Sequence, residues 1–245
     1  MKKLLVVVML TMSCAMAPTD TSEISSNVIS ASRIDVDRIT NNRESIHLVA
    51  ENALTKGSSV SSAVEALLST DSGVEVFSAL AACALPPTVI LTSGSLQFFG
   101  ELGLAPNWEN RALNTAERQW VSACMLTKVS GISLASAISL RGVRHLKTDK
   151  DERDGWMVQE GAFFGNIFSN PIKWFACQGN GHITNPTDGQ LSTRVCAEED
   201  PNHPGTTKCG FTFVGQCEDV CSKTKDFFTR CNPSLDREVI TVYLM

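Results

Sequence analysis

The feature that most limits how this chain can fold is the crowding of six cysteines between residues 177 and 231. With Cys14, Cys83 and Cys124 they make up the nine cysteines of the 245-residue sequence. This density is typical of domains that disulfides hold together in an oxidising compartment. Without Cys14 an even number remains, which predicts up to four disulfides. The cysteines expected to form them are Cys83, Cys124, Cys177, Cys196, Cys209, Cys217, Cys221 and Cys231.

Sequence context narrows the pairing of these cysteines. Eight cysteines can pair in about 105 ways, so spacing alone does not give the connectivity. Cys83 and Cys124 each lie in a separate helical pattern, far from the other cysteines. We therefore predict that they pair with each other. The C-terminal six then pair among themselves, in one of about 15 ways.

Residues 1–13 have the pattern of a secretory signal peptide. Lys2 and Lys3 precede an apolar run over residues 4–10, and small residues follow. The run is too short for a membrane span, which needs about 20 apolar residues. We therefore expect an exported protein.

Two processing routes are open after this signal. Residues 10–14 resemble the lipobox of bacterial lipoproteins, which predicts lipidation of Cys14, although Thr11 departs from the usual aliphatic residue. The alternative is ordinary cleavage after Ala17, which would leave Pro18 first; a proline fits the extended binding mode of a protease poorly. The sequence favours an outer-membrane lipoprotein, with a periplasmic or secreted protein as the alternative.

The rest of the chain predicts a tether and one domain. Residues 14–42 are predicted to be a flexible tether, because 18–42 are rich in Ser, Thr, Asn and Asp without a sustained apolar period; a disordered terminus is the alternative. Residues 43–245 can form a single disulfide-stapled domain of the α+β class, with N-terminal helices, a small mixed sheet and a loop-rich C-terminal region.

Apolar periodicity places the expected elements. Asn41 and Glu44 resemble a capping box at the start of the first helix. The stretch 156–168 is apolar with two glycines, and it fits either a helix or a strand. The expected helices cover 43–56, 59–69, 75–85 and 115–128, and the expected strands cover 88–91, 96–99, 134–140, 172–177 and 238–244.

Charge excludes some partners. The formal net charge is −5, and no cluster of Lys and Arg offers the footprint of a nucleic-acid site. The sequence also lacks a basic amphipathic helix for anionic lipid. We expect contact with the membrane through the lipid anchor only.

The sequence gives two metal sites only weak support. Asp149, Asp151 and Glu160 have the spacing of a calcium loop, but Asp154 stands where that loop needs a glycine, so a solvated charged turn is the better interpretation. Zinc could in principle bind His203 with four cysteines. However, no Cys-x-x-Cys pair is present, and thiols oxidise in an exported chain. The cysteines concerned are Cys209, Cys217, Cys221 and Cys231.

No recognised catalytic or cofactor motif is present, so we predict no cofactor. The weak catalytic candidates are Glu160, His182 and Asp188, which could meet only in space. Glu160 beside an apolar stretch could be a buried acid, although a structural position is commoner. Four tryptophans could line a sugar site, but core packing is the better prediction for them. They are Trp108, Trp120, Trp156 and Trp174.

Several segments resemble a known group of proteins. They are ELGLAPNW (101–108), QWVSACMLTKVSG (119–131), QEGAFFGNIF (159–168), RVCAEEDP (194–201) and KCGFTFVGQC (208–217). These segments are similar to uncharacterised cysteine-rich exported proteins, including predicted lipoproteins, of myxobacterial-type bacteria. The resemblance covers roughly residues 80 to 245 and implies an envelope location and disulfides, without an activity.

The expected function is therefore a non-enzymatic binding or structural module of the cell envelope, with an unknown envelope or extracellular partner. The alternative is a secreted or surface-anchored hydrolase with a site assembled from distant residues.

Overall fold

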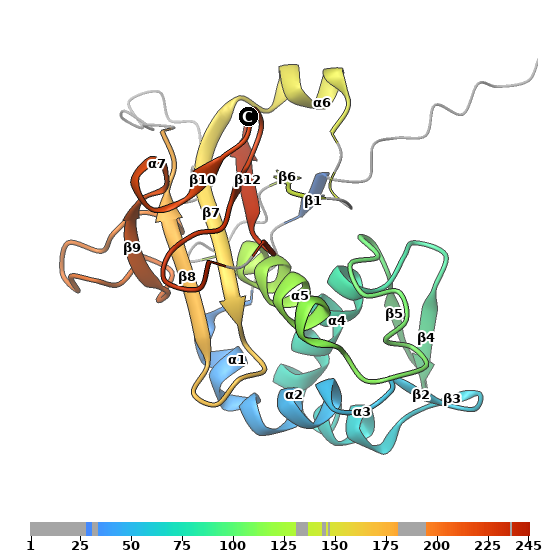
Figure 1. The fold of residues 1–245 in the computed structure, drawn as a ribbon. Coiled ribbons are helices and arrows are strands. Elements are labelled where there is room, and N and C mark those ends of the chain that lie inside the picture. The colour runs from blue at the N-terminus through green and yellow to red at the C-terminus, as the bar shows by residue number, and fades with distance from the viewer. Residues whose placement is uncertain are drawn as a thin grey trace, which may run out of the picture.

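The computed structural model describes residues 28–30, 34–130, 137–143, 146, 148–180, 195–235 and 237–245. The predicted signal peptide and Cys14 lie outside this part of the chain. Within it, helices and a mixed sheet form an α+β fold, as the sequence predicted. Figure 1 shows the sheet on one side of the molecule, the N-terminal helices on the other, and helix α5 between them.

The main sheet has six strands in the order β1-β6-β12-β7-β8-β9. Neighbours are antiparallel except β8 and β9, which are parallel and make the sheet mixed. The C-terminal strand β12 lies between β6 and β7, and all its residues are buried. The strands are β1 (Val28–Ser30), β6 (Ala137–Arg141), β7 (Val158–Asn166), β8 (Lys173–Gln178), β9 (Thr212–Gln216) and β12 (Ile240–Leu244).

Helices and three small hairpins complete the fold. The helices are α1 (Val36–Asn41), α2 (Arg43–Ala50), α3 (Ser62–Leu67), α4 (Asp71–Ala84), α5 (Thr115–Lys128), α6 (Lys150–Gly155) and α7 (Cys217–Val220). The hairpins pair β2 (Thr55–Lys56) with β3 (Ser59–Val60), β4 (Ile90–Ser93) with β5 (Leu96–Phe99), and β10 (Ser222–Lys223) with β11 (Phe228–Thr229). None of the described helices is long and apolar enough to cross a membrane.

Helix α5 occupies the predicted range, and its start explains why. The Asn114 side chain accepts from the Glu117 N–H, and the Glu117 carboxylate accepts from the Asn114 N–H, which together form a capping box. From Trp120 onward every residue of the helix is buried, because α4 covers one side and strands β7 and β12 cover the other. The helix therefore joins the two halves of one core.

The predicted tether is wrong over its second half. Residues 28–30 form the edge strand of the sheet, paired with β6, and helix α1 follows. Ile29, Ile34 and Ile39 are all buried in the core. Single apolar residues in a polar sequence give no helical or strand period, so packing against distant elements determines their structure.

Two local predictions also change, and one open alternative is settled. Asn41 lies inside α1, and the next helix is capped by Asn42 without a side-chain hydrogen bond, so the predicted capping box does not form. Helix α2 ends at Ala50 rather than residue 56, because residues 55–60 form a hairpin. The ambiguous stretch 156–168 contains strand β7.

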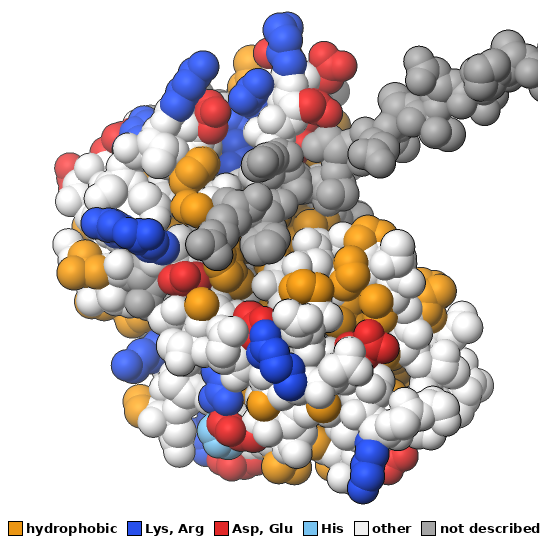
Figure 2. All heavy atoms as spheres, turned by 45° about the vertical axis from the view of Figure 1, so that its right-hand side comes forward, with side chains coloured by type: hydrophobic (Ala, Val, Ile, Leu, Met, Phe, Trp, Pro, Cys, Tyr) orange, Lys and Arg blue, Asp and Glu red, His pale blue; other side chains and the backbone are white. Residues whose placement is uncertain are grey.

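The β4–β5 hairpin leaves an apolar face in solvent. Ile90 and Phe99 are paired across the hairpin and are 52% and 54% exposed, while Leu91 and Phe98 face the core. Figure 2 shows hydrophobic side chains gathered on the right of the molecule, the side that carries this hairpin.

Candidate functional site

All eight predicted disulfide cysteines are paired. Cys83 of α4 is bonded to Cys124 of α5, as the sequence predicted, and both are fully buried. The C-terminal six pair among themselves, also as predicted. Their bonds are Cys177–Cys217, Cys196–Cys209 and Cys221–Cys231. Because disulfides persist in oxidising compartments, this set indicates an extracytoplasmic location.

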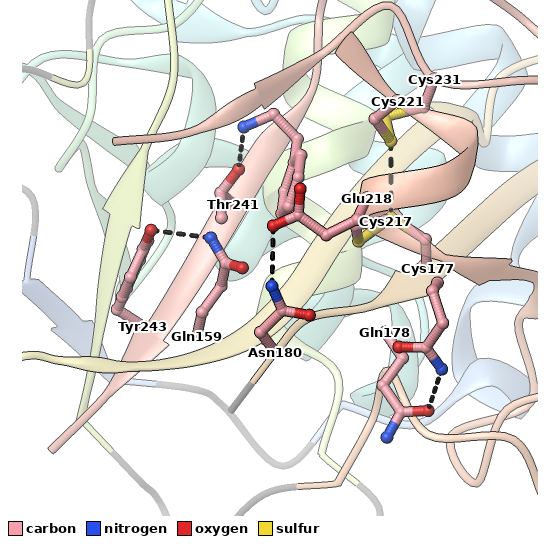
Figure 3. The surroundings of a disulfide bond; sticks show 12 residues. Gln159, Cys177, Gln178, Asn180, Cys217, Glu218, Cys221, Cys231, Thr241 and Tyr243 are labelled. Carbon is pink, nitrogen blue, oxygen red and sulfur yellow. Dashed lines mark hydrogen bonds between the residues drawn. A yellow bond between two sulfur atoms is a disulfide. The ribbon is translucent and has the colours of Figure 1, made fainter. Parts of the chain in front are cut away.

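Two of these bridges touch and form what we call the sulfur cluster, Cys177–Cys217 with Cys221–Cys231. The Sγ atoms of Cys177 and Cys221 lie 3.5 Å apart, a non-bonded contact between separate bridges. Figure 3 shows the four cysteines side by side, with Glu218 nearby accepting a hydrogen bond from Asn180 at 2.7 Å. The cluster holds β8, α7 and the segment after β11 together.

The disulfides remove the thiolates that a zinc site needs. Three sulfur atoms of the sulfur cluster lie within 4.8 Å of one another, but all belong to disulfides. His203 is exposed, and its Nδ1 lies 2.7 Å from Asp200. The hydrogen bond with His203, together with one from the Asn202 N–H, lowers the pKa of Asp200. His203 therefore belongs to a surface turn.

The calcium-like residues do not form a loop. Asp149 caps α6, where its side chain accepts from the Glu152 N–H at 2.8 Å. Asp154 lies on that helix and pairs with Lys150. Glu160 lies in strand β7. A helix and a strand cannot turn the acidic side chains around one ion, as the calcium loop requires.

Glu160 is in a structural position. It is 5% exposed, and its Oε1 accepts from the Cys196 N–H at 3.0 Å. The carboxylate thereby fixes the start of the loop that the Cys196–Cys209 disulfide closes. His182 and Asp188 lie outside the described residues, so the predicted convergence of the three groups stays a prediction.

The tryptophans pack in the core, as predicted. Trp108, Trp120 and Trp156 are buried, and the half-buried Trp174 lies against Phe211. The Trp108 indole N–H donates to the Asn52 carbonyl at 3.2 Å.

Trp120 also lines a surface cleft of about 410 Å³ at the start of α5, which we call the α5 cleft. This volume lies within the usual range of about 300–1,000 Å³ for small-molecule sites. Both apolar and polar side chains line it. Its lining residues are Leu104, Pro106, Asn107, Asn114, Ala116, Glu117, Trp120, Val143, Arg237 and Glu238. Sequence reasoning missed this cleft because its lining comes from two segments that are more than 90 residues apart, 104–143 and 237–238.

Glu117, which lines the α5 cleft, forms an ion pair with Arg111. Arg111 donates to both carboxylate oxygens of Glu117, at 2.6 and 2.7 Å. Burial raises the pKa of Glu117, but hydrogen bonds from Arg111 and from the Asn114 N–H outweigh it, so the pKa lies below the ordinary value. The hydrogen bond with Glu117 raises the pKa of Arg111. Both groups are therefore charged at neutral pH and fix the first turn of α5.

Comparison with protein-family models, with curated proteins and with solved structures finds no match to this chain. The class that the fold and the disulfides define is therefore a disulfide-stapled α+β protein of an extracytoplasmic compartment.

Proposed function

We propose that this protein is a lipid-anchored envelope protein that acts as a non-enzymatic binding or structural module. The observation that carries the proposal is the closure of all eight described cysteines into four disulfides. No described cysteine keeps a thiol for nucleophilic catalysis, and the carboxylate of Glu160 accepts a backbone hydrogen bond. The signal-like residues 1–13 and the lipobox-like Cys14 support export and anchoring.

The α5 cleft is the binding site in this proposal. Trp120 offers an apolar surface, and the exposed Asn107 and Asn114 carry amide groups that both donate and accept. Arg237 and Glu238 contribute one charge of each sign, and the charge of Glu117 is paired with Arg111, so the described charges balance. These groups suit a small, neutral, polar ligand with one apolar face, and a monosaccharide has these properties.

Cell fractionation tests the location. We expect the wild-type protein in the membrane fraction with an acyl mass on Cys14, and the Cys14→Ala variant in a soluble exported fraction with all four disulfides intact. Recovery of the wild-type protein from the cytosol with reduced cysteines would contradict the proposal.

Ligand-observed NMR with a panel of monosaccharides tests the cleft. Ala116 is exposed and lines the cleft, so Ala116→Trp should fill the space at little cost to stability. Thr115→Trp is the matched control, because Thr115 is the exposed neighbour and does not line the cleft. We expect binding that Ala116→Trp abolishes and Thr115→Trp keeps. Equal binding by all three proteins, or by none, removes the cleft from the proposal.

A further inference from the structure

Arg141, the last residue of β6, is a buried cation. Only 5% of the residue is exposed. The Nη2 atom donates to the Trp156 carbonyl at 2.6 Å, and the guanidinium carbon lies 3.6 Å from the centre of the Tyr243 ring. These contacts fix the plane of the guanidinium but supply no negative charge.

The structure provides no counter-ion for this group among the described residues. The Nε atom of Arg141 is buried without a hydrogen-bond acceptor. The buried carboxylate of Glu152 accepts from the Ser139 hydroxyl at 2.7 Å, and no described carboxylate pairs with Arg141. Buried charges are normally paired, because an unpaired one loses its hydration without compensation. An anion bound next to Arg141 would supply the negative charge that the described residues do not provide.

A pocket of about 270 Å³ lies next to Arg141 and is separate from the α5 cleft. Its second cation is Arg153, whose guanidinium lies 3.5 Å from the carboxylate of Asp226. Leu146 and Phe227 give it apolar walls. Among the described residues, its lining is Arg141, Gly142, Leu146, Thr148, Arg153, Asp226 and Phe227.

We propose that this pocket binds a small monocarboxylate, with Arg141 as the main ligand of the carboxylate group. Arginine recognises carboxylates with its planar fork of N–H donors. Two guanidiniums and one carboxylate give the described lining one net positive charge, which matches a monoanion, whereas Asp226 would repel a dianion such as phosphate. The volume lies just below the usual range for drug-sized ligands, so the carboxylate carries only a short apolar tail.

Titration of the folded chain with butyrate, followed by ¹H–¹⁵N NMR, tests this proposal. We expect saturable shifts of the Gly142 and Thr148 amide signals. Butylammonium has the same tail and the opposite charge, so it should produce no such shifts. Inorganic phosphate should bind at least about tenfold more weakly than butyrate, since charge repulsion opposes the dianion. Tighter binding of phosphate, or no saturable shift with butyrate, overturns the proposal.

Variants separate a ligand role of Arg141 from a structural one. Arg141→Met keeps a long side chain without charge and should weaken butyrate binding roughly 10- to 100-fold, as expected for the loss of a charge-assisted hydrogen bond. Arg43→Met is the matched control, because it removes an exposed guanidinium elsewhere. If Arg141→Met does not fold, Asp226→Asn decides, because the loss of the repelling charge should tighten binding about twofold to fivefold. Unchanged affinity in a folded Arg141→Met variant, or in Asp226→Asn, contradicts the proposal.

Discussion

Among the disulfides whose loop contains no other cysteine, removal of Cys83–Cys124 should lower the free energy of unfolding the most. It joins residues 41 apart, and no other cysteine lies between them, so its loop has no inner cross-link. Loop-closure entropy predicts a stabilisation of roughly 4 kcal/mol for a loop of that length. The Cys221–Cys231 bridge spans 10 residues and also encloses no other cysteine. The same relation gives it roughly 2.7 kcal/mol.

The comparison of two double variants tests this difference. Urea unfolding without reductant should show Cys83→Ala/Cys124→Ala losing about 1.3 kcal/mol more stability than Cys221→Ala/Cys231→Ala, because both variants lose two sulfur atoms and differ in loop length. The slope of unfolding against urea should also rise more in the first variant, since its unfolded chain expands further. The loop argument fails if Cys83→Ala/Cys124→Ala is no less stable than the control variant.

Three further predictions use single substitutions. Trp108→Ala should cost about 3–5 kcal/mol in thermal or urea unfolding, because it empties a fully buried site; a loss below about 1 kcal/mol would contradict that burial. Gly161→Ala should cost more than about 2 kcal/mol, because its Cβ would lie 2.2 Å from the Cys177 carbonyl. The control Gly205→Ala meets no atom within 4 Å and should cost about 1 kcal/mol through its positive φ alone. The pKa of Glu117 is lowered in the folded state, so its contribution to stability is present above the ordinary carboxyl pKa and is lost as the pH falls through the folded value. Wild-type protein should therefore lose more stability than Glu117→Gln between about pH 6 and pH 3, and equal losses would refute a stabilising pair with Arg111.

The sequence was sufficient to predict a feature where local signals marked both ends of an element or left a cysteine only one partner. Asn114 and Glu117 mark the start of α5, and apolar spacing continues to Lys128, so both ends of that helix were predictable. The Cys83–Cys124 pair was predictable because no other partner lay nearby in the sequence.

Distant contacts explain the parts that the sequence did not reveal. The apolar spacing after Ala50 still fits a helix. However, the Leu54 and Thr55 N–H groups donate to the carbonyls of Trp108 and Glu109, and a hairpin forms instead. Hydrogen bonds between residues more than 50 positions apart cannot be predicted from a short stretch of sequence. The same holds for the α5 cleft, whose walls come from residues 104–143 and 237–238. Arg141 directly follows the strand predicted over 134–140, and no local signal indicates its burial.

The fold begins earlier in the chain than predicted, which shortens the segment that can separate the sheet from Cys14. An extended chain spans at most about 3.6 Å per residue, so a tether from Cys14 to residue 42 could have extended roughly 100 Å. Strand β1 begins at Val28, which limits the distance from Cys14 to the sheet to roughly 50 Å. That is little more than the thickness of a bilayer with its headgroups, about 40–45 Å. A lipid on Cys14 would therefore hold the β1 edge of the sheet close to the membrane surface, and a partner that contacts this edge must lie within the same narrow layer.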